Sequence, residues 1–160
     1  MATNISDRIN QYVHTDLHDM QHDSFWDFVL LWNLFESRIF NSSYSPEDVA
    51  AKNLIVPKEL VEKTLVYFKK RYVKNGQVNE KFQRLKLRTK SDKQSLVKGV
   101  LLGNNHDECA IVEACIIIIG RYRNNLFHGL KEIASLNLQK DNFDTANEFL
   151  MSVLENNTQH

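Results

Sequence analysis

The chain is poor in the residues that build tight turns and cross-links. It has only 5 glycines, 2 prolines and 2 cysteines among its 160 residues. So few turn residues disfavour an all-β protein, which needs a turn between successive short strands. Cys109 and Cys115 lie on one predicted helix, about 9 Å apart along its axis, which exceeds the span of a disulfide. We therefore expect two free cysteines that act as small buried residues.

Long apolar runs and net charge are also missing. No apolar run reaches the ~18 residues that span a bilayer, and residues 1–24 are too polar for a signal peptide. These features predict a cytoplasmic protein with no membrane partner. The formal net charge is +0. This total conceals a basic segment over residues 69–98, flanked by acidic segments on both sides.

The apolar residues that are present recur with the period of an α-helix. Helices are predicted over 25–40, 46–54, 57–76, 91–103, 107–128 and 143–154, with Ser24 and Ser91 as N-caps and Gly76 as a C-terminal cap. The first is expected to be mostly buried through an apolar stripe formed by Phe25, Phe28, Trp32, Phe35, Ile39, Leu30, Leu31 and Leu34. The β-branched run 116–119 would suit a strand, but the length of its element favours a helix. We predict an all-α, single-domain, up-and-down helical bundle over 1–160, with 156–160 frayed.

Two polar features each allow two interpretations. His14, His18 and His22 recur at a spacing of four, so they share a helix face that either binds a metal or faces solvent. Because no carboxylate or cysteine elsewhere has ligand spacing, we predict no metal site. Glu36 stands among aromatic residues without a basic residue three or four positions away. It is either a boundary carboxylate that reaches water or a partner for an Arg or His from another helix.

The basic segment over residues 69–98 interleaves cations with aromatic rings. Its cations are Lys69, Lys70, Arg71, Lys74, Lys81, Arg84, Lys86, Arg88, Lys90, Lys93 and Lys98, and the rings are Tyr67, Phe68, Tyr72 and Phe82. Positive charge suits a phosphate backbone, and rings suit unstacked bases. We expect Lys69, Lys70, Arg71 and Lys74 to bind RNA. The alternative is a solvated face followed by a mobile loop near 86–92.

A polar string, Arg121-Tyr122-Arg123-Asn124-Asn125-Leu126-Phe127-His128-Gly129, follows the apolar run 109–119. Polar groups at the end of a buried element need partners, so the string builds a structural network or a site. An imidazole near a guanidinium suits attack of a ribose 2′-hydroxyl on the adjacent phosphate. His128 would relay the proton and Arg123 would hold the phosphate, without a metal or cofactor. Asn124 would orient His128 or the substrate, and Arg121, seven residues before His128, is a second candidate arginine.

The segment Arg123-Asn124-Asn125-Leu126-Phe127-His128-Gly129 resembles the Arg-Asn-x-x-x-His signature of the HEPN superfamily, toxin-like RNase domains included. The aromatic helix with Trp32 and Glu36, the apolar helix before the motif and the last amphipathic helix fit the same pattern. The resemblance implies a small helical domain that forms a homodimer with a composite cleft and cleaves RNA without a metal. It also implies a toxin or defence role, in some members with a nucleotidyltransferase-type antitoxin as partner. Other members only bind RNA, a nucleotide or a protein, which is the alternative function.

Overall fold

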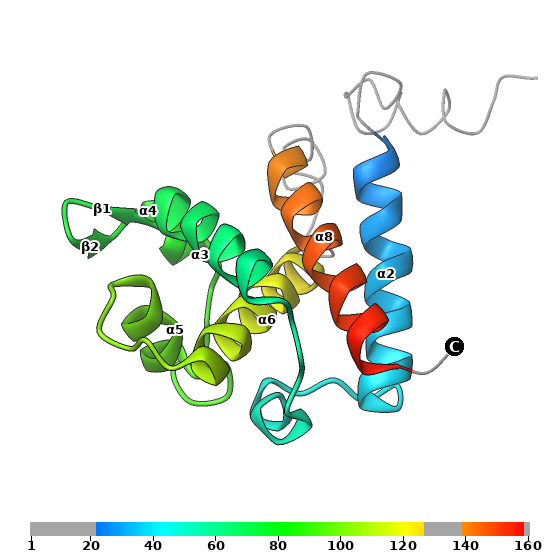
Figure 1. Ribbon diagram of the computed structural model, residues 1–160. Coiled ribbons are helices and arrows are strands. Elements are labelled where there is room, and N and C mark those ends of the chain that lie inside the picture. The colour runs from blue at the N-terminus through cyan, green and yellow to red at the C-terminus, as the bar shows by residue number, and fades with distance from the viewer. Residues whose placement is uncertain (1–21, 127–138, 159–160) are drawn as a thin grey trace, which may run out of the picture.

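Helices account for most of the residues that the computed structural model describes, which are 22–126 and 139–158 (Figure 1). The elements in chain order are α2 (His22–Phe40), η1 (Pro46–Asp48), η2 (Ala50–Lys52), α3 (Lys58–Tyr72), β1 (Val73–Lys74), β2 (Gln77–Val78), α4 (Glu80–Arg84), α5 (Gln94–Leu101), α6 (Glu108–Asn125) and α8 (Lys140–Asn157). The strands form one short antiparallel hairpin. The predicted helical character is confirmed.

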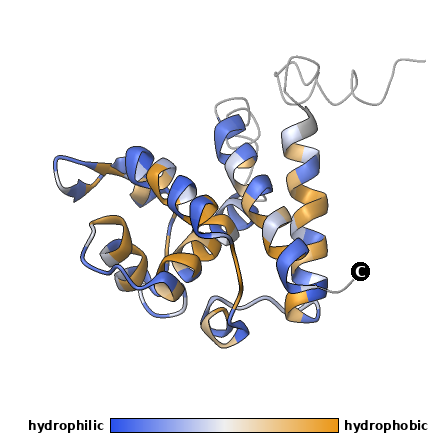
Figure 2. Cartoon of the chain, viewed as in Figure 1, coloured by the Kyte–Doolittle hydropathy of each residue, from blue (hydrophilic) through white to orange (hydrophobic). Residues whose placement is uncertain are grey.

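Helix α6 forms the centre of the core. The Asp107 side chain accepts a hydrogen bond from the backbone N–H of Ala110 at 2.9 Å and caps this helix, which begins where the sequence predicts. Residues 112–122 are all buried, and Figure 2 shows α6 as largely hydrophobic. Helices α3 and α5 pack against it (Figure 1). The β-branched run is therefore helical because burial on all sides outweighs its strand propensity.

Helices α2 and α8 pack side by side although they come from opposite ends of the described chain (Figure 1). Ser24 near the start of α2 bonds to Asp144 and, through its carbonyl, to the Asn147 side chain near the start of α8. The rings of Phe28 and Phe143 meet at 5.2 Å. The two helices are therefore parallel. Ser24 lies within α2 rather than at its start, so its predicted role as N-cap is wrong.

The outward face of α2 is more exposed than the sequence predicts. Phe28, Trp32 and Phe35 are buried, but Leu30 and Leu34 are 63% and 47% exposed. The reason is that α8 and the core cover one side of α2 only. The prediction that Leu30 and Leu34 widen a buried stripe is therefore wrong.

Several predicted local signals act differently in the fold. Asn75 and Gly76 both have positive φ and form the turn of the β1–β2 hairpin, so Gly76 does not cap α3. This Asn-Gly pair is the usual sequence of a two-residue hairpin turn. The predicted helix over 46–54 consists of the two short 3₁₀ helices, and α5 begins after Lys93 without a side-chain cap from Ser91.

Gly120 lets the loop after α2 pack against α6. A methyl group on its α-carbon would lie 2.7 Å from the Tyr44 Oη atom and 3.1 Å from two ring carbons. The Tyr44 ring itself lies edge-on to Trp32 and Phe40, with centroid distances of 4.8 and 5.1 Å. A glycine is therefore needed at this contact because any side chain would meet a ring that is already packed.

Both cysteines are free, as expected, and Cys115 is buried. Cys109 is exposed because it lies in the first turn of α6, so the prediction that it is buried is wrong. Among the described helices, none combines the length and the apolar character needed to cross a membrane.

Candidate functional site

The last turn of α6 sends three consecutive side chains in three directions. Arg121 is buried against the segment that follows α4, and Tyr122 is buried against α3. Arg123 is exposed. Successive helical residues are rotated by about 100°, so one buried helix can end in a structural arginine and an accessible one.

Arg121 belongs to a buried ion-pair network. Its Nε atom donates to the Leu85 carbonyl at 2.9 Å, and its guanidinium lies 3.5 Å from the Asp92 carboxylate. Asp92 is fully buried, and Arg88 donates to it from its backbone N–H at 2.7 Å and from two guanidinium nitrogens at 3.1 Å. Burial alone would raise the Asp92 pKa, but these bonds hold it below its usual value. The described segment near 86–92 is thus anchored to α6.

Two more ionisable side chains lie near this network. The carboxylate of Glu113, buried in α6, pairs with the Lys93 ammonium. The Tyr44 hydroxyl is buried without a hydrogen-bond partner among the described residues. Burial and the nearby Asp92 carboxylate raise the pKa of Tyr44 above its usual value, so it stays protonated. These groups fix the loops around α6.

Arg123 and Asn124 form a pair at the accessible end of α6. A guanidinium nitrogen of Arg123 donates to the Asn124 side-chain oxygen at 3.1 Å. The next residue, Asn125, donates long bonds of 3.5 Å to the carbonyls of Arg84 and Leu85, which ties this turn to the segment after α4. The predicted arginine and its neighbour are thus together at the surface. The third predicted member of the site, His128, lies outside the described residues.

The Glu36 carboxylate bonds within its own helix. It accepts a hydrogen bond from the Trp32 indole nitrogen at 2.9 Å, one turn earlier on α2. Of its two predicted interpretations, a partner Arg or His from another helix is not present among the described residues. Glu36 is half-buried, and its place in the fold is beside the Tyr44 ring cluster rather than at the end of α6.

The basic segment over residues 69–98 does not form one uniform face. Arg84, Arg88 and Lys93 are paired with Glu80, Asp92 and Glu113. Of the four predicted RNA-binding residues, Lys70 and Arg71 line a pocket, Lys74 is on the hairpin, and Lys69 extends toward Gly103 after α5. Some cations of this segment therefore form ion pairs within the fold, and others line the pocket.

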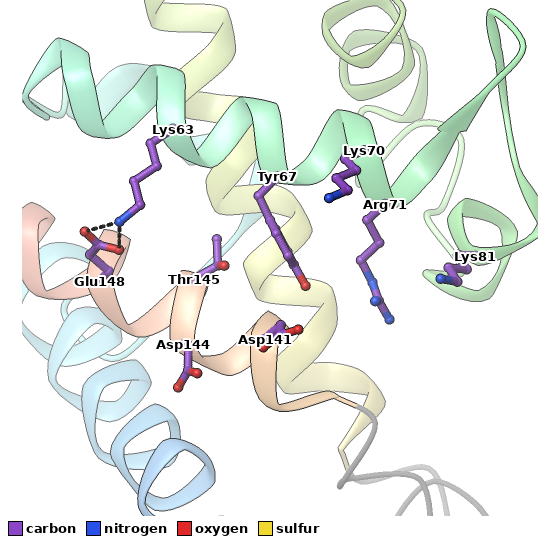
Figure 3. A pocket seen from close by; sticks show the side chains of 9 residues that line it. All are labelled: Lys63, Tyr67, Lys70, Arg71, Lys81, Asp141, Asp144, Thr145 and Glu148. Carbon is purple, nitrogen blue, oxygen red and sulfur yellow. Dashed lines mark hydrogen bonds and ion pairs between the residues drawn. The ribbon is translucent and has the colours of Figure 1, made fainter.

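This pocket, of about 580 Å³, lies between α3 and α8 (Figure 3). Its α3 and α4 side is lined by Lys63, Tyr67, Lys70, Arg71 and Lys81, and its α8 side by Asp141, Asp144, Thr145 and Glu148. We did not predict the α8 residues from the sequence. The sequence does carry a signal for them: the other three lie three, four and seven residues after Asp141, which places all four on the face of α8 opposite the buried Phe143.

Two separate tyrosine hydrogen bonds join α3 to its neighbours beside the pocket, one to α8 and one to the last turn of α6. The Tyr67 hydroxyl donates to the buried Asn142 side chain at 2.6 Å, and the Tyr72 and Tyr122 hydroxyls meet at 2.6 Å. Burial raises the pKa of Tyr72 to about 12 and that of Tyr122 well above its usual value. Burial would lower the pKa of Arg71, but the neighbouring Tyr72, Tyr122 and Tyr67 raise it. All of these groups therefore keep their protons at neutral pH.

No three His, Cys, Asp or Glu side chains within the described ranges gather closely enough to share a metal ion. The side chains of the predicted histidine cluster, His14, His18 and His22, lie outside the described residues. Comparison of the chain with protein-family models, with curated proteins and with solved structures finds no match.

Proposed function

We propose that the chain is a HEPN-like, metal-independent endoribonuclease with its site at the end of α6. The observation that carries the proposal is the exposed Arg123, paired with Asn124, directly after the buried residues 112–122 of α6. Arg121 is engaged inside the fold by Leu85 and Asp92, which favours Arg123 as the arginine of the Arg-Asn-x-x-x-His string. In this proposal, the helices form the bundle that the resemblance implies.

The proposed reaction is attack of a ribose 2′-hydroxyl on its own 3′-phosphate. His128 takes the proton from the 2′-hydroxyl or gives one to the leaving 5′-oxygen. A histidine can do either because imidazole ordinarily titrates near neutral pH. Arg123 holds the phosphate through its planar guanidinium and stabilises the charge that develops on the equatorial oxygens. Asn124 holds the Arg123 guanidinium through the bond of 3.1 Å, and this preorganises the clamp. The products carry 2′,3′-cyclic phosphate and 5′-hydroxyl ends.

We propose that the active form is a homodimer in which two copies of the α6 end face each other. A single exposed Arg123 at the end of α6 leaves an open site, whereas two-fold pairing encloses it. Leu30 and Leu34 on α2 are exposed apolar side chains, and burying them would favour self-association. The biological role consistent with this activity is that of a toxin or defence RNase in the cytoplasm, with a nucleotidyltransferase-type antitoxin as the proposed partner.

The direct test is cleavage of labelled RNA by the purified protein in EDTA. We expect cleavage to continue without metal and to produce cyclic phosphate ends. His128→Ala and Arg123→Ala should each lower the rate by about 10²- to 10⁴-fold while circular dichroism stays unchanged. Arg123→Lys should also lose most activity because an ammonium lacks the bidentate fork.

Arg38→Ala is the matched control, since Arg38 is an exposed arginine in the last turn of another helix. Its rate should equal that of the wild type. Strict dependence on Mg²⁺, or rapid cutting of a substrate with a 2′-deoxy sugar at the cleavage position, would falsify the mechanism. RNA binding without any cleavage would instead favour the alternative function, a non-catalytic binding module.

A further inference from the structure

We propose that the pocket between α3 and α8 binds a single ribonucleotide unit. Its phosphate would lie against Lys70, Arg71 and Lys81, its base against Tyr67, and its ribose hydroxyls toward Asp141 (Figure 3). The same chemistry is supplied by one nucleotide of an RNA chain or by a free mononucleotide. As an RNA subsite, the inference rests on the proposed function; as a nucleotide site, it stands alone.

The charges around the pocket sort into paired and unpaired groups. Lys63 pairs with Glu148 at 2.8 Å, and Lys140 pairs with Asp144, which also accepts from Ser24. Those charges are neutralised locally. Among the described residues, Lys70, Arg71 and Lys81 have no carboxylate within ion-pair distance. Three unpaired cations around one concave surface favour a phosphate group.

Arg71 supplies the most specific signal for an anion. Its Nε atom is buried and has no hydrogen-bond acceptor among the described residues. Its guanidinium lies 5.8 Å from the centroid of the Tyr72 ring. That atom is closed to solvent, so a phosphate oxygen in the pocket would meet the accessible part of this half-buried side chain instead. Figure 3 shows this side chain extending from α3 into the space between α3 and α8.

Tyr67 provides a fixed aromatic surface beside Arg71. Its hydroxyl donates to the Asn142 side chain at 2.6 Å, and Asn142 is buried in α8. This bond fixes the ring orientation while the residue remains only half-buried. A rigid, partly exposed ring suits stacking of a base, because every base presents a π-face whatever its sequence.

Asp141 faces the pocket from the first turn of α8, across from Arg71 (Figure 3). Its carboxylate is exposed and accepts no hydrogen bond from the described side chains, in contrast to Asp144. A carboxylate opposite a phosphate site is the usual acceptor for ribose hydroxyls in nucleotide sites. The pocket should therefore prefer ribose over 2′-deoxyribose.

One hydrogen bond connects the α3 wall of the pocket to the last turn of α6. Arg71 precedes Tyr72, whose hydroxyl meets that of Tyr122, and Arg123 is the next residue of α6. In the proposal, a nucleotide held in the pocket belongs to the same RNA strand as the scissile phosphate. It would position the strand for Arg123 without taking part in the chemistry.

The test measures binding by the full chain, without reference to cleavage. Calorimetry would compare uridine 5′-monophosphate, its 2′-deoxy analogue and inorganic phosphate. A second arm would titrate labelled octauridine into the His128→Ala variant, so that cutting cannot interfere. The variants are Arg71→Met and Asp141→Asn. Lys98→Met is the matched control, because Lys98 is an exposed cation of the same basic segment outside the pocket and is not one of the four predicted RNA-binding residues.

We expect Arg71→Met to weaken binding of the ribonucleotide about tenfold or more, and Lys98→Met to leave it unchanged. The ribo form should bind more tightly than the deoxy form, and Asp141→Asn should remove that difference. If Arg71→Met weakens the binding of octauridine but not of uridine 5′-monophosphate, the ligand is an RNA chain. If it weakens the binding of both, a free nucleotide is also a ligand.

Three results would overturn the inference: equal losses in Arg71→Met and Lys98→Met, inorganic phosphate binding as tightly as the ribonucleotide, or no binding of any probe. Circular dichroism of Arg71→Met checks that a loss reflects the site rather than unfolding. A chain that binds through Arg71 but never cuts RNA would contradict the proposed nuclease and leave this pocket intact.

Discussion

Replacing Gly120 with alanine tests how tightly the loop after α2 packs on the central helix. In a helix interior, alanine is more favourable than glycine by about 1 kcal/mol. At Gly120 the new methyl would lie 2.7 Å from Tyr44 Oη and 3.1 Å from two ring carbons. Tyr44 cannot retreat without disturbing Trp32 and Phe40, whose ring centroids lie 4.8 and 5.1 Å away. Overpacking of this kind costs about 1–3 kcal/mol.

Gly99 provides a matched control because it lies within α5 and a methyl there would meet nothing within 4 Å. Gly99→Ala should therefore stabilise the protein by up to about 1 kcal/mol. The propensity gain is common to both variants, so their difference isolates the clash. We expect Gly120→Ala to be less stable than Gly99→Ala by about 1–3 kcal/mol, equivalent to roughly 2–12 °C in Tm for a chain of this size.

Urea unfolding followed by circular dichroism at one fixed protein concentration is the assay, since assembly would make stability depend on concentration. Tyr44→Phe removes the nearest atom, and its own cost should be small because the hydroxyl has no hydrogen-bond partner among the described residues. In the Tyr44→Phe background, Gly120→Ala should therefore cost less. If Gly120→Ala proves as stable as Gly99→Ala, the close packing of Tyr44 on α6 is refuted.

Three further predictions concern the arginines, pH and assembly. Arg121→Met should destabilise the fold by about 1–3 kcal/mol, because the Leu85 carbonyl and the Asp92 carboxylate each lose a hydrogen-bond donor. If the Arg121→Met protein folds but no longer cleaves RNA, the choice of Arg123 as the site arginine is contradicted. The pKa of Asp92 is lowered in the fold below its usual 3.8. The hydrogen bonds to its carboxylate therefore stabilise the fold above that pH, and this stabilisation is lost as the pH falls through the pKa of Asp92 in the folded protein. The stability gap between wild type and Asp92→Asn should accordingly be largest near neutral pH and shrink below about pH 4, as urea titrations at several pH values would show. Sedimentation should find a homodimer, and a monomer at every accessible concentration would exclude the two-fold site.

The sequence by itself determined the helices and the place of the candidate motif. The cap at Asp107, the apolar run over 109–119 and the helical period of α2 are local properties, and they predicted elements that the fold contains. The same local information placed Arg123 and Asn124 at the end of the most buried helix. Boundaries were less accurate: α8 extends beyond both ends of the predicted 143–154, and Gly76 turned out to serve a hairpin rather than a helix end.

Tertiary structure decided which side of each helix is covered. Periodicity shows that α2 has an apolar face, but it cannot show that α8 pairs with it in parallel and leaves Leu30 and Leu34 exposed. Spacing left Arg121 as a second candidate beside Arg123. The engagement of Arg121 inside the fold comes from the buried Asp92 and the Leu85 carbonyl, which belong to another part of the chain. The pocket between α3 and α8 likewise brings Arg71 and Asp141 together from distant positions. Helix formation depends on neighbours within one turn, whereas burial and charge pairing depend on residues that only the folded chain brings into contact.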